Sequence, residues 1–359
     1  MSFQKDSVHV TSGNLWVNIW QLSWPMLLIM IFNFFVGFTD VYVAGFINAG
    51  VQAAIGFISQ LYFLIIIIAN SISIGTLALV SRAVGSGNFH KAVEIAKQSI
   101  LFSIIIAAGL MCIGLLFYRE IISLAGFPDE IRKISETFLR IFAIALASNY
   151  ILIVSNAVFR ASGEVNKPLV TMFLVSVINV IGDFVLVFGI FPFPKLGYSG
   201  IALSTAISVT LGMIINMRFF SLMRWRSIYA LPWKLSTSMI KNIVSIGWPA
   251  AFLQFAWTTG SIILYNILGR LGTASITALA ALTNGLRIEA IIYLPAFALN
   301  MAASVLVGQN LGARDAERAE RLGWKISIAG VTLISVMAVI IFMWAHFFCL
   351  VTRKKYRCT

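Results

Sequence analysis

Nine long apolar segments constrain the fold of this chain more than any other feature of its sequence. They occupy residues 15–46, 52–80, 91–117, 129–159, 167–189, 197–223, 236–268, 273–306 and 317–350. A helix needs about 20 apolar residues to cross a bilayer. Charged residues make up only 11% of the chain, against about 25% in a soluble domain. The sequence therefore predicts an all-α integral membrane protein, a polytopic bundle of about nine transmembrane helices in contact with the lipid bilayer.

The net charge of +13 is concentrated in alternate loops. Basic residues are frequent after the second, fourth, sixth and eighth segments, and are rare after the first, fifth and seventh. Loops rich in Lys and Arg remain in the cytoplasm, so we expect a cytoplasmic N-terminus in a bacterial or archaeal cytoplasmic membrane. No polar helix carries a basic stripe interleaved with aromatic residues, so the sequence predicts no nucleic-acid partner.

Reactive and metal-binding residues are sparse. The three cysteines and three histidines are scattered, without zinc spacing or a disulfide framework. No nucleophile motif or phosphate-binding loop is present. We therefore expect neither an enzyme nor a bound cofactor.

An internal repeat is visible in two pairs of landmarks. "LSWPMLL" recurs as "IGWPAAF", and "VSRAVGSGNFHKA" recurs as "VGQNLGARDAERA". Pro25 precedes Gly85 by 60 residues, and Pro249 precedes Gly312 by 63. The repeating unit spans six helices, an even number, so the two copies are parallel in the membrane. We expect a first six-helix lobe at 1–223, a cytoplasmic linker at 224–241, and a partial second lobe of three helices at 242–359, which ends in a basic tail.

This repeat predicts a twelve-helix protein truncated after its ninth helix. The tail "TRKKYRCT" would then follow an outward-running helix, where a polybasic segment is unfavourable. We therefore expect that a complete version has about 90–100 further residues.

Three acidic residues lie inside apolar segments: Asp40, Asp183 and Glu289. A carboxylate there costs about 3 kcal/mol on insertion scales, so it is expected to have a function. Asp40 and Asp183 both lie near the outer ends of their segments, with Asn179 one turn before Asp183 and Thr205 at a similar depth. We predict that these four side chains form a site for H⁺ or Na⁺. The alternative is a structural pair hydrogen-bonded to the backbone.

Three other positions have two interpretations. Pro25 removes a backbone hydrogen bond from the first segment, which indicates either a hinge or a static kink. Arg287 and Glu289 are two residues apart and face different directions on a helix, so a polar site of the second lobe is only one interpretation. Arg140 is one turn from Glu136, which predicts an ion pair between them.

The residues resemble the multidrug and toxic compound extrusion (MATE) family. The resemblance rests on "SWPMLLIMIFNFFVGFTDVYVAGF", "GNFHKA", "FRASGEVNKP", "INVIGDFVLVFG" and "GIALSTAIS". It implies two six-helix lobes in a V shape and export driven by an H⁺ or Na⁺ gradient. Asp40, Asn179, Asp183 and Thr205 match the family's cation-coupling positions, and Pro25 matches its helix-bending proline. Trp257 replaces an acid found in one branch, which makes the chain similar to the DNA-damage-inducible subgroup.

The function expected from this resemblance is secondary antiport, the export of amphipathic or cationic organic compounds in exchange for H⁺ or Na⁺. The full-length protein is expected to be a monomer whose partners are small-molecule substrates. A lipid-linked saccharide flippase of the same superfamily is one alternative, and a non-transporting truncated remnant is another.

Overall fold

The computed structural model describes residues 12–123, 128–222, 224–230, 234–269 and 275–356. Its long helices, within these residues, are α1 (Leu15–Ile47), α2 (Ala49–Gly85), α3 (Phe89–Leu116), α5 (Asp129–Ala161), α6 (Asn166–Phe188), α7 (Tyr198–Leu222), α8 (Thr237–Gly269), α9 (Ser275–Gly312) and α10 (Ala316–Tyr356). Two short helices, α4 (Tyr118–Ser123) and the 3₁₀ helix η2 (Arg224–Tyr229), lie between long ones. Each predicted apolar segment coincides with one long helix.

Asparagine residues mark the starts of three helices. Asn14, Asn48 and Asn88 each accept a hydrogen bond from a backbone N–H in the first turn of α1, α2 and α3. An N-cap side chain satisfies a donor that the helix itself leaves without a partner. Gly189 ends α6 in the left-handed conformation, with φ of 71°, which only glycine adopts readily. Local sequence therefore sets several of the helix limits.

Eight of the described helices contain a stretch long and apolar enough to cross a membrane. The eight are α1, α2, α3, α5, α6, α7, α9 and α10. The ninth predicted segment, at 236–268, also forms a single long helix, α8 (Thr237–Gly269).

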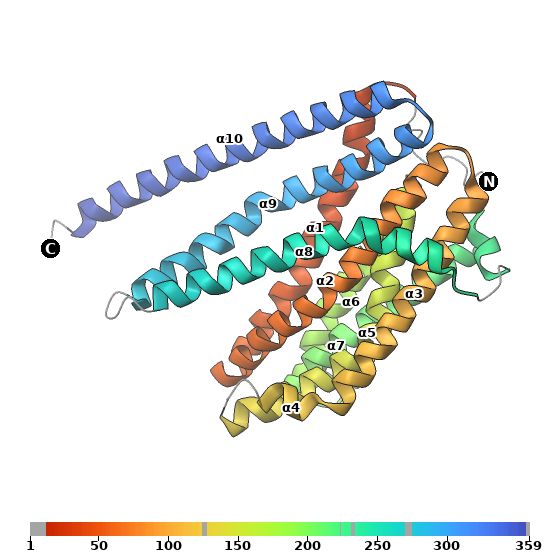
Figure 1. Ribbon diagram of the computed structural model, residues 1–359. Helices are drawn as coiled ribbons and strands as arrows, with labels where there is room; N and C mark the ends of the chain where they lie inside the picture. The colour runs from red at the N-terminus through yellow and green to blue at the C-terminus, as the bar shows by residue number, and fades with distance from the viewer. Residues whose placement is uncertain (1–11, 124–127, 223, 231–233, 270–274, 357–359) are drawn as a thin grey trace.

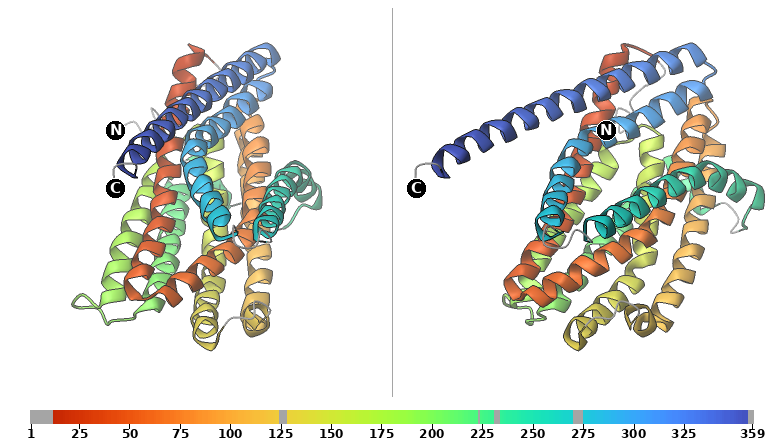
Figure 2. Two further views of the ribbon diagram at one scale, coloured as in Figure 1. Left: turned by 90° about the vertical axis from the view of Figure 1, so that its left-hand side faces the viewer. Right: turned by 60° about the vertical axis from the view of Figure 1, so that its left-hand side comes forward.

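Figure 1 shows that α1, α2, α3, α5, α6 and α7 lie together, and we call these six helices the N-terminal bundle. Helix α10 extends well away from this bundle, as the right-hand view in Figure 2 also shows. The links α2–α3, α5–α6, α7–α8 and α9–α10 all lie at the end where α1 begins. We call this the basic end, because Arg82, Lys91, Arg160, Arg224 and Arg314 lie there.

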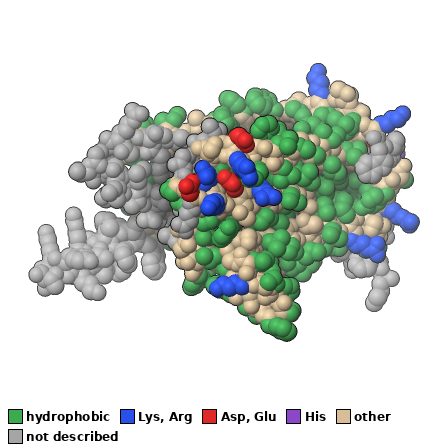
Figure 3. Space-filling model, turned by 90° about the horizontal axis from the view of Figure 1, so that it is seen from below, with side chains coloured by type: hydrophobic (Ala, Val, Ile, Leu, Met, Phe, Trp, Pro, Cys, Tyr) green, Lys and Arg blue, Asp and Glu red, His purple; other side chains and the backbone are tan. Residues whose placement is uncertain are grey.

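The opposite end carries acids and bases together, as Figure 3 shows in a view from that side. Arg132 pairs there with Asp129 at 3.0 Å and with Glu136 at 3.7 Å. The expected Glu136–Arg140 pair is therefore wrong. The Arg140 guanidinium instead lies over the Tyr118 ring, 5.3 Å from its centroid, where the cation is attracted by the ring face.

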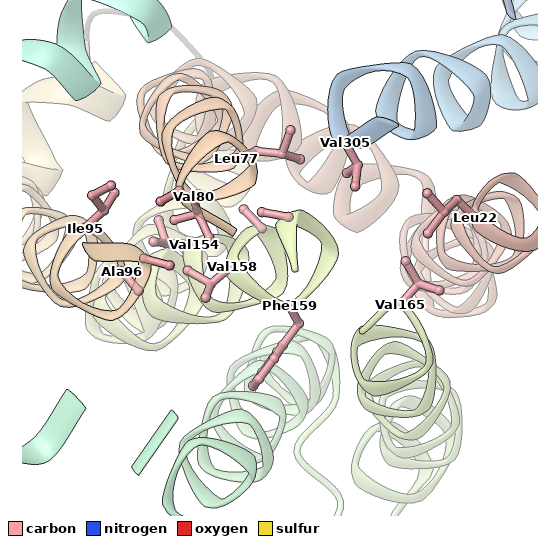
Figure 4. Packing of buried hydrophobic residues seen from close by; sticks show 14 of the residues in the cluster. Leu22, Leu77, Val80, Ile95, Ala96, Val154, Val158, Phe159, Val165 and Val305 are labelled. Atoms are coloured by element: carbon pink, nitrogen blue, oxygen red, sulfur yellow. The ribbon is translucent and has the colours of Figure 1, made fainter. Parts of the chain in front are cut away.

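The largest hydrophobic core lies towards the basic end. It combines side chains of α1, α2, α3 and α5 with side chains of α9, and Leu22, Leu77, Val158 and Val305 are four of its members. Figure 4 shows Val305 of α9 close to this group. The C-terminal helices α8–α10 are therefore packed onto the N-terminal bundle at this end.

The contact between α2 and α9 is reciprocal. A Cβ added at Gly85 would overlap the carbonyl oxygen of Gln309, and a Cβ added at Gly312 would overlap that of Arg82. The sequence repeat aligns Gly85 with Gly312 and Arg82 with Gln309. Each glycine therefore faces the repeat counterpart of its own neighbour, as two parallel copies related by a twofold axis require. This contact supports the repeat.

Candidate functional site

The four residues predicted to form a cation site come together from three helices. Asp40 is on α1, Asn179 and Asp183 are on α6, and Thr205 is on α7. The Asn179 amide donates to Thr205 Oγ1 at 3.0 Å and to Asp40 Oδ1 at 3.4 Å. The Thr205 hydroxyl lies 3.3 Å and 3.4 Å from the two Asp40 oxygens. The Asp183 carboxyl lies beside that of Asp40.

The site is buried and lies near the end of the bundle opposite the basic end. Asp183 and Asn179 are both 0% exposed, whereas Asp40 and Thr205 are half-buried. Asp40 precedes the end of α1 by seven residues, and Asp183 precedes the end of α6 by five. At about 1.5 Å per residue these positions lie roughly 8–11 Å inside the helix ends. The depth agrees with the expectation from sequence.

Close packing of α6 on α7 shapes the site. A Cβ added at Gly182 would lie 2.5 Å from Ser204 Oγ, so the glycine lets α7 approach the turn that carries Asp183. Ser204 donates a hydrogen bond of 2.8 Å to the Asn179 carbonyl oxygen. Sequence reasoning missed Ser204, although its position next to Thr205 was a signal. The serine ties α7 to the backbone of α6 at the level of the carboxyls.

Three oxygen atoms of this site are buried without a hydrogen-bond donor. Asn179 Oδ1 and both oxygens of Asp183 receive no hydrogen bond of ordinary geometry from the described residues. A buried polar atom without a partner costs about 1–3 kcal/mol. Two adjacent carboxyls in a buried site also repel each other unless a proton or a cation lies between them. Among the described residues, no Lys or Arg forms an ion pair with Asp40 or Asp183.

The donor set fits a hard cation or a proton. Carboxylate, amide and hydroxyl oxygens are the ligands of hard cations. The orphaned oxygens of Asn179 and Asp183 provide positions for such an ion, and Thr205 adds a hydroxyl. A proton shared between Asp40 and Asp183 would also remove the repulsion. The arrangement is therefore chemically suited to reversible uptake of a small cation.

The other predicted positions lie apart from this group. Pro25 is buried inside α1, which continues through it as one helix. Glu289 is half-buried in α9, and no described hydrogen bond or ion pair joins it to the four residues. The Arg287 side chain and the basic side chains from 353 onwards lie outside the described part of the structure. A polar site of the second lobe at Arg287 and Glu289 therefore stays a prediction.

A second polar cluster, which the sequence analysis did not single out, is centred on Asn216 of α7. The Asn216 amide donates to Ser155 Oγ and to Asn156 Oδ1, each at 2.8 Å, and it accepts from Thr171 Oγ1 at 2.8 Å. All four residues are buried, and they join α5, α6 and α7. This network is satisfied, so it fixes the three helices that carry the cation site.

A third cluster surrounds Glu164, between α5 and α6 at the basic end. Glu164 Oε1 accepts from Arg224 Nε at 2.7 Å and from Trp225 Nε1 at 3.3 Å, while its other oxygen is paired with Lys167. The Arg224 guanidinium also lies 4.6 Å from the centroid of the Phe89 ring. The segment that follows α7 is therefore attached to the N-terminal bundle.

Comparison with known proteins gives a consistent assignment. The MatE family model matches residues 25–185 and 249–355. The two matches begin at the two Trp-Pro prolines, which supports the internal repeat. An uncharacterised transporter of Bacillus subtilis (strain 168), YisQ, is 23% identical over 325 residues, covering 88% of this chain and 70% of the relative.

A probable multidrug resistance protein NorM of Thermotoga maritima is 24% identical over 317 residues, covering 86% of this chain and 66% of the relative. The chain thus spans about two thirds of the length of these relatives. A solved structure described as the outward-facing conformation of a multidrug resistance MATE family transporter superposes with a TM-score of 0.84 at 20% identity. That superposition covers 94% of this chain and 74% of the other, and it confirms the fold.

Proposed function

Because this chain belongs to the MATE family of integral membrane transporters, we propose that it is a secondary antiporter. It exports amphipathic, often cationic, organic compounds in exchange for H⁺ or Na⁺. The observation that carries the proposal is the group of three buried oxygens on Asn179 and Asp183 that lack a donor beside Asp40. The driving force in this proposal is the H⁺ or Na⁺ gradient, which the site uses by binding the cation on one side of the membrane and releasing it on the other.

The site residues have distinct roles in this proposal. Asp183 and Asp40 hold the coupling ion by charge, while Asn179 and Thr205 orient the Asp40 carboxyl and add neutral oxygens. The ion enters from outside, from which the site is about 8–11 Å deep. One charge moved across the full membrane potential gains about 2.3 kcal/mol per 100 mV. Occupancy by one ion cancels one of the two negative charges and removes the repulsion between the carboxyls, which lets α1, α6 and α7 pack differently against bound substrate.

The membrane arrangement belongs to the same proposal. The basic end faces the cytoplasm, with the N-terminus, in a bacterial or archaeal membrane. Residues 1–223 act as the first lobe, 224–241 as the linker and 242–359 as part of a second lobe, in a protein that functions as a monomer. Pro25 is the point at which α1 bends. A lipid-linked saccharide flippase remains the alternative in this superfamily, and the buried acid pair favours antiport over it.

Transport in everted membrane vesicles tests this function. Vesicles that contain the full-length protein should accumulate a fluorescent amphipathic cation when their lumen is made acidic or sodium-rich. Accumulation should stop when an ionophore collapses the gradient. Gradient-independent movement of a lipid-linked sugar, without drug accumulation, would favour the flippase instead.

A further inference from the structure

Arg160 is a buried cation that takes part neither in the polar clusters described above nor in the proposed cation site. It lies in the last turn of α5 at the basic end and is 7% exposed. Its Nε is fully buried without a hydrogen-bond partner, and no ion pair among the described residues includes Arg160. A buried guanidinium has five N–H donors and requires an anion or several acceptors to offset its desolvation.

The nearest acid in sequence does not supply that anion. Glu164 follows Arg160 by one helical turn, but its two oxygens are occupied by Arg224, Trp225 and Lys167. Asn156, one turn earlier on the same face of α5, directs its Oδ1 to Asn216. The side-chain oxygens of Glu164 and Asn156 therefore bind other residues and not Arg160. What Arg160 lacks at this position is therefore an anionic partner.

Helix α9 covers the chain next to Arg160. Gln309 donates a hydrogen bond of 2.7 Å to the carbonyl oxygen of Ala161, the residue that follows Arg160, and Gln309 is itself 4% exposed. The same glutamine provides the carbonyl that Gly85 accommodates. Separation of α9 from the N-terminal bundle at this end would break this hydrogen bond and admit a solute to the end of α5.

We propose that Arg160 is an anion-binding site, covered by Gln309, that holds the phosphate or carboxylate of an amphipathic compound entering at the basic end. The planar guanidinium binds such groups through two parallel hydrogen bonds. The inference rests on the proposed transport function and deepens it, because it adds compounds with an acidic group to the substrate class. Separation of the acidic pair and Arg160 at opposite ends of the bundle lets one protein hold a cation and an anion without their pairing.

Riboflavin 5′-phosphate and riboflavin provide a matched pair of probes, because both fluoresce and they differ only in the phosphate. Binding to the purified chain in phosphatidylcholine nanodiscs is measured by fluorescence anisotropy, without any gradient. The unmodified chain should bind the phosphate form on the order of tenfold more tightly, as expected for a charge-assisted hydrogen-bonded pair. Arg160→Gln should remove this preference. Arg226→Gln, which neutralises an exposed arginine of η2 at the same end, should retain it.

Two further variants keep the test decisive. Arg160→Lys retains the charge but loses the two-point geometry, so the preference should fall by at least half even if Arg160→Gln does not fold. Gln309→Ala removes the cover and should speed association of the phosphate form in stopped-flow measurements. Equal binding of the two flavins by the unmodified chain, absence of binding, or an unchanged preference in Arg160→Lys or Arg160→Gln overturns the proposal.

A lipid headgroup is the other source of a phosphate, and a change of lipid distinguishes it. Replacing phosphatidylcholine by phosphatidylglycerol should leave the flavin preference within a factor of about two, because surface charge alone is a weak and screened effect. Loss of the preference would assign Arg160 to lipid and overturn the claim for a solute. Failure of gradient-driven export in vesicles would contradict the antiporter alone, since flavin binding is measured without a gradient.

Discussion

The Cα hydrogens of Gly85 on α2 face the carbonyl oxygen of Gln309 on α9 so closely that a side chain at position 85 would not fit. Gly85→Ala should therefore push the helices apart and destabilise the chain by about 1–3 kcal/mol, as overpacking does in cores. Thermal unfolding in detergent measures this. Gly109→Ala is the matched control, because a Cβ at Gly109 meets no heavy atom within 4 Å. Equal unfolding temperatures for the two variants would contradict a tight crossing.

Thr205→Val tests the neutral part of the cation site. Valine preserves the shape of the side chain but removes the hydroxyl that bonds Asn179 and Asp40. Loss of a hydrogen bond to a charged group costs about 1.5–3 kcal/mol, so the ion concentration for half-maximal export should rise roughly tenfold or more. Thr210→Val removes a hydroxyl that bonds only the Ala206 carbonyl of its own helix. It should leave that concentration unchanged, and a similar rise in both variants would contradict a specific role for Thr205.

The fold was largely predictable from sequence because bilayer thickness fixes the length of apolar helices. The limits of α1, predicted at 15–46, differ from the structure by a single residue. The site residues Asp40 and Asp183 were recognisable because a carboxylate in an apolar helix is costly. The limit of this reasoning lies in contacts between helices. The Arg140–Tyr118 contact and the Ser204–Asn179 bond depend on how distant segments pack, which helical periodicity does not specify.

The Glu164 cluster should contribute measurably to stability. Glu164→Gln leaves Lys167 and Arg224 without their anion. Lys167 has 11% of its side chain exposed, whereas Arg224 has 42%, so water compensates for part of the loss at Arg224. We expect a loss of about 1–3 kcal/mol in unfolding free energy, below the full cost of a broken buried pair.

Glu317→Gln is the control for this effect. Glu317 pairs with Arg321, and both side chains are well exposed, at 75% and 64%. Such a surface pair contributes about 0–1 kcal/mol. The two variants are compared by their unfolding midpoints in a denaturant titration. Equal midpoints for Glu164→Gln and Glu317→Gln would show that the Glu164 cluster does not stabilise the attachment of the linker.

The orientation of the molecule is tested by labelling single cysteines on a background without Cys112, Cys349 and Cys358. A cysteine at Ser227, in η2 at the basic end, should react only with a membrane-permeant maleimide in intact cells. A cysteine at Lys133, at the opposite end, should also react with an impermeant reagent. The reverse pattern would contradict the assignment of the basic end to the cytoplasm, which rests on the distribution of Lys and Arg.

The most direct test of the antiport mechanism is drug accumulation in everted vesicles after Asp183→Asn. The variant should insert and fold, since the neutral amide lowers the membrane cost of a carboxylate, about 3 kcal/mol on insertion scales. It should nevertheless lose accumulation driven by an acidic or sodium-rich lumen. Asp129→Asn, at a side chain 80% exposed, should accumulate drug as the unmodified chain does. Gradient-driven accumulation by Asp183→Asn at the unmodified rate, or none by the unmodified full-length protein, would contradict the account.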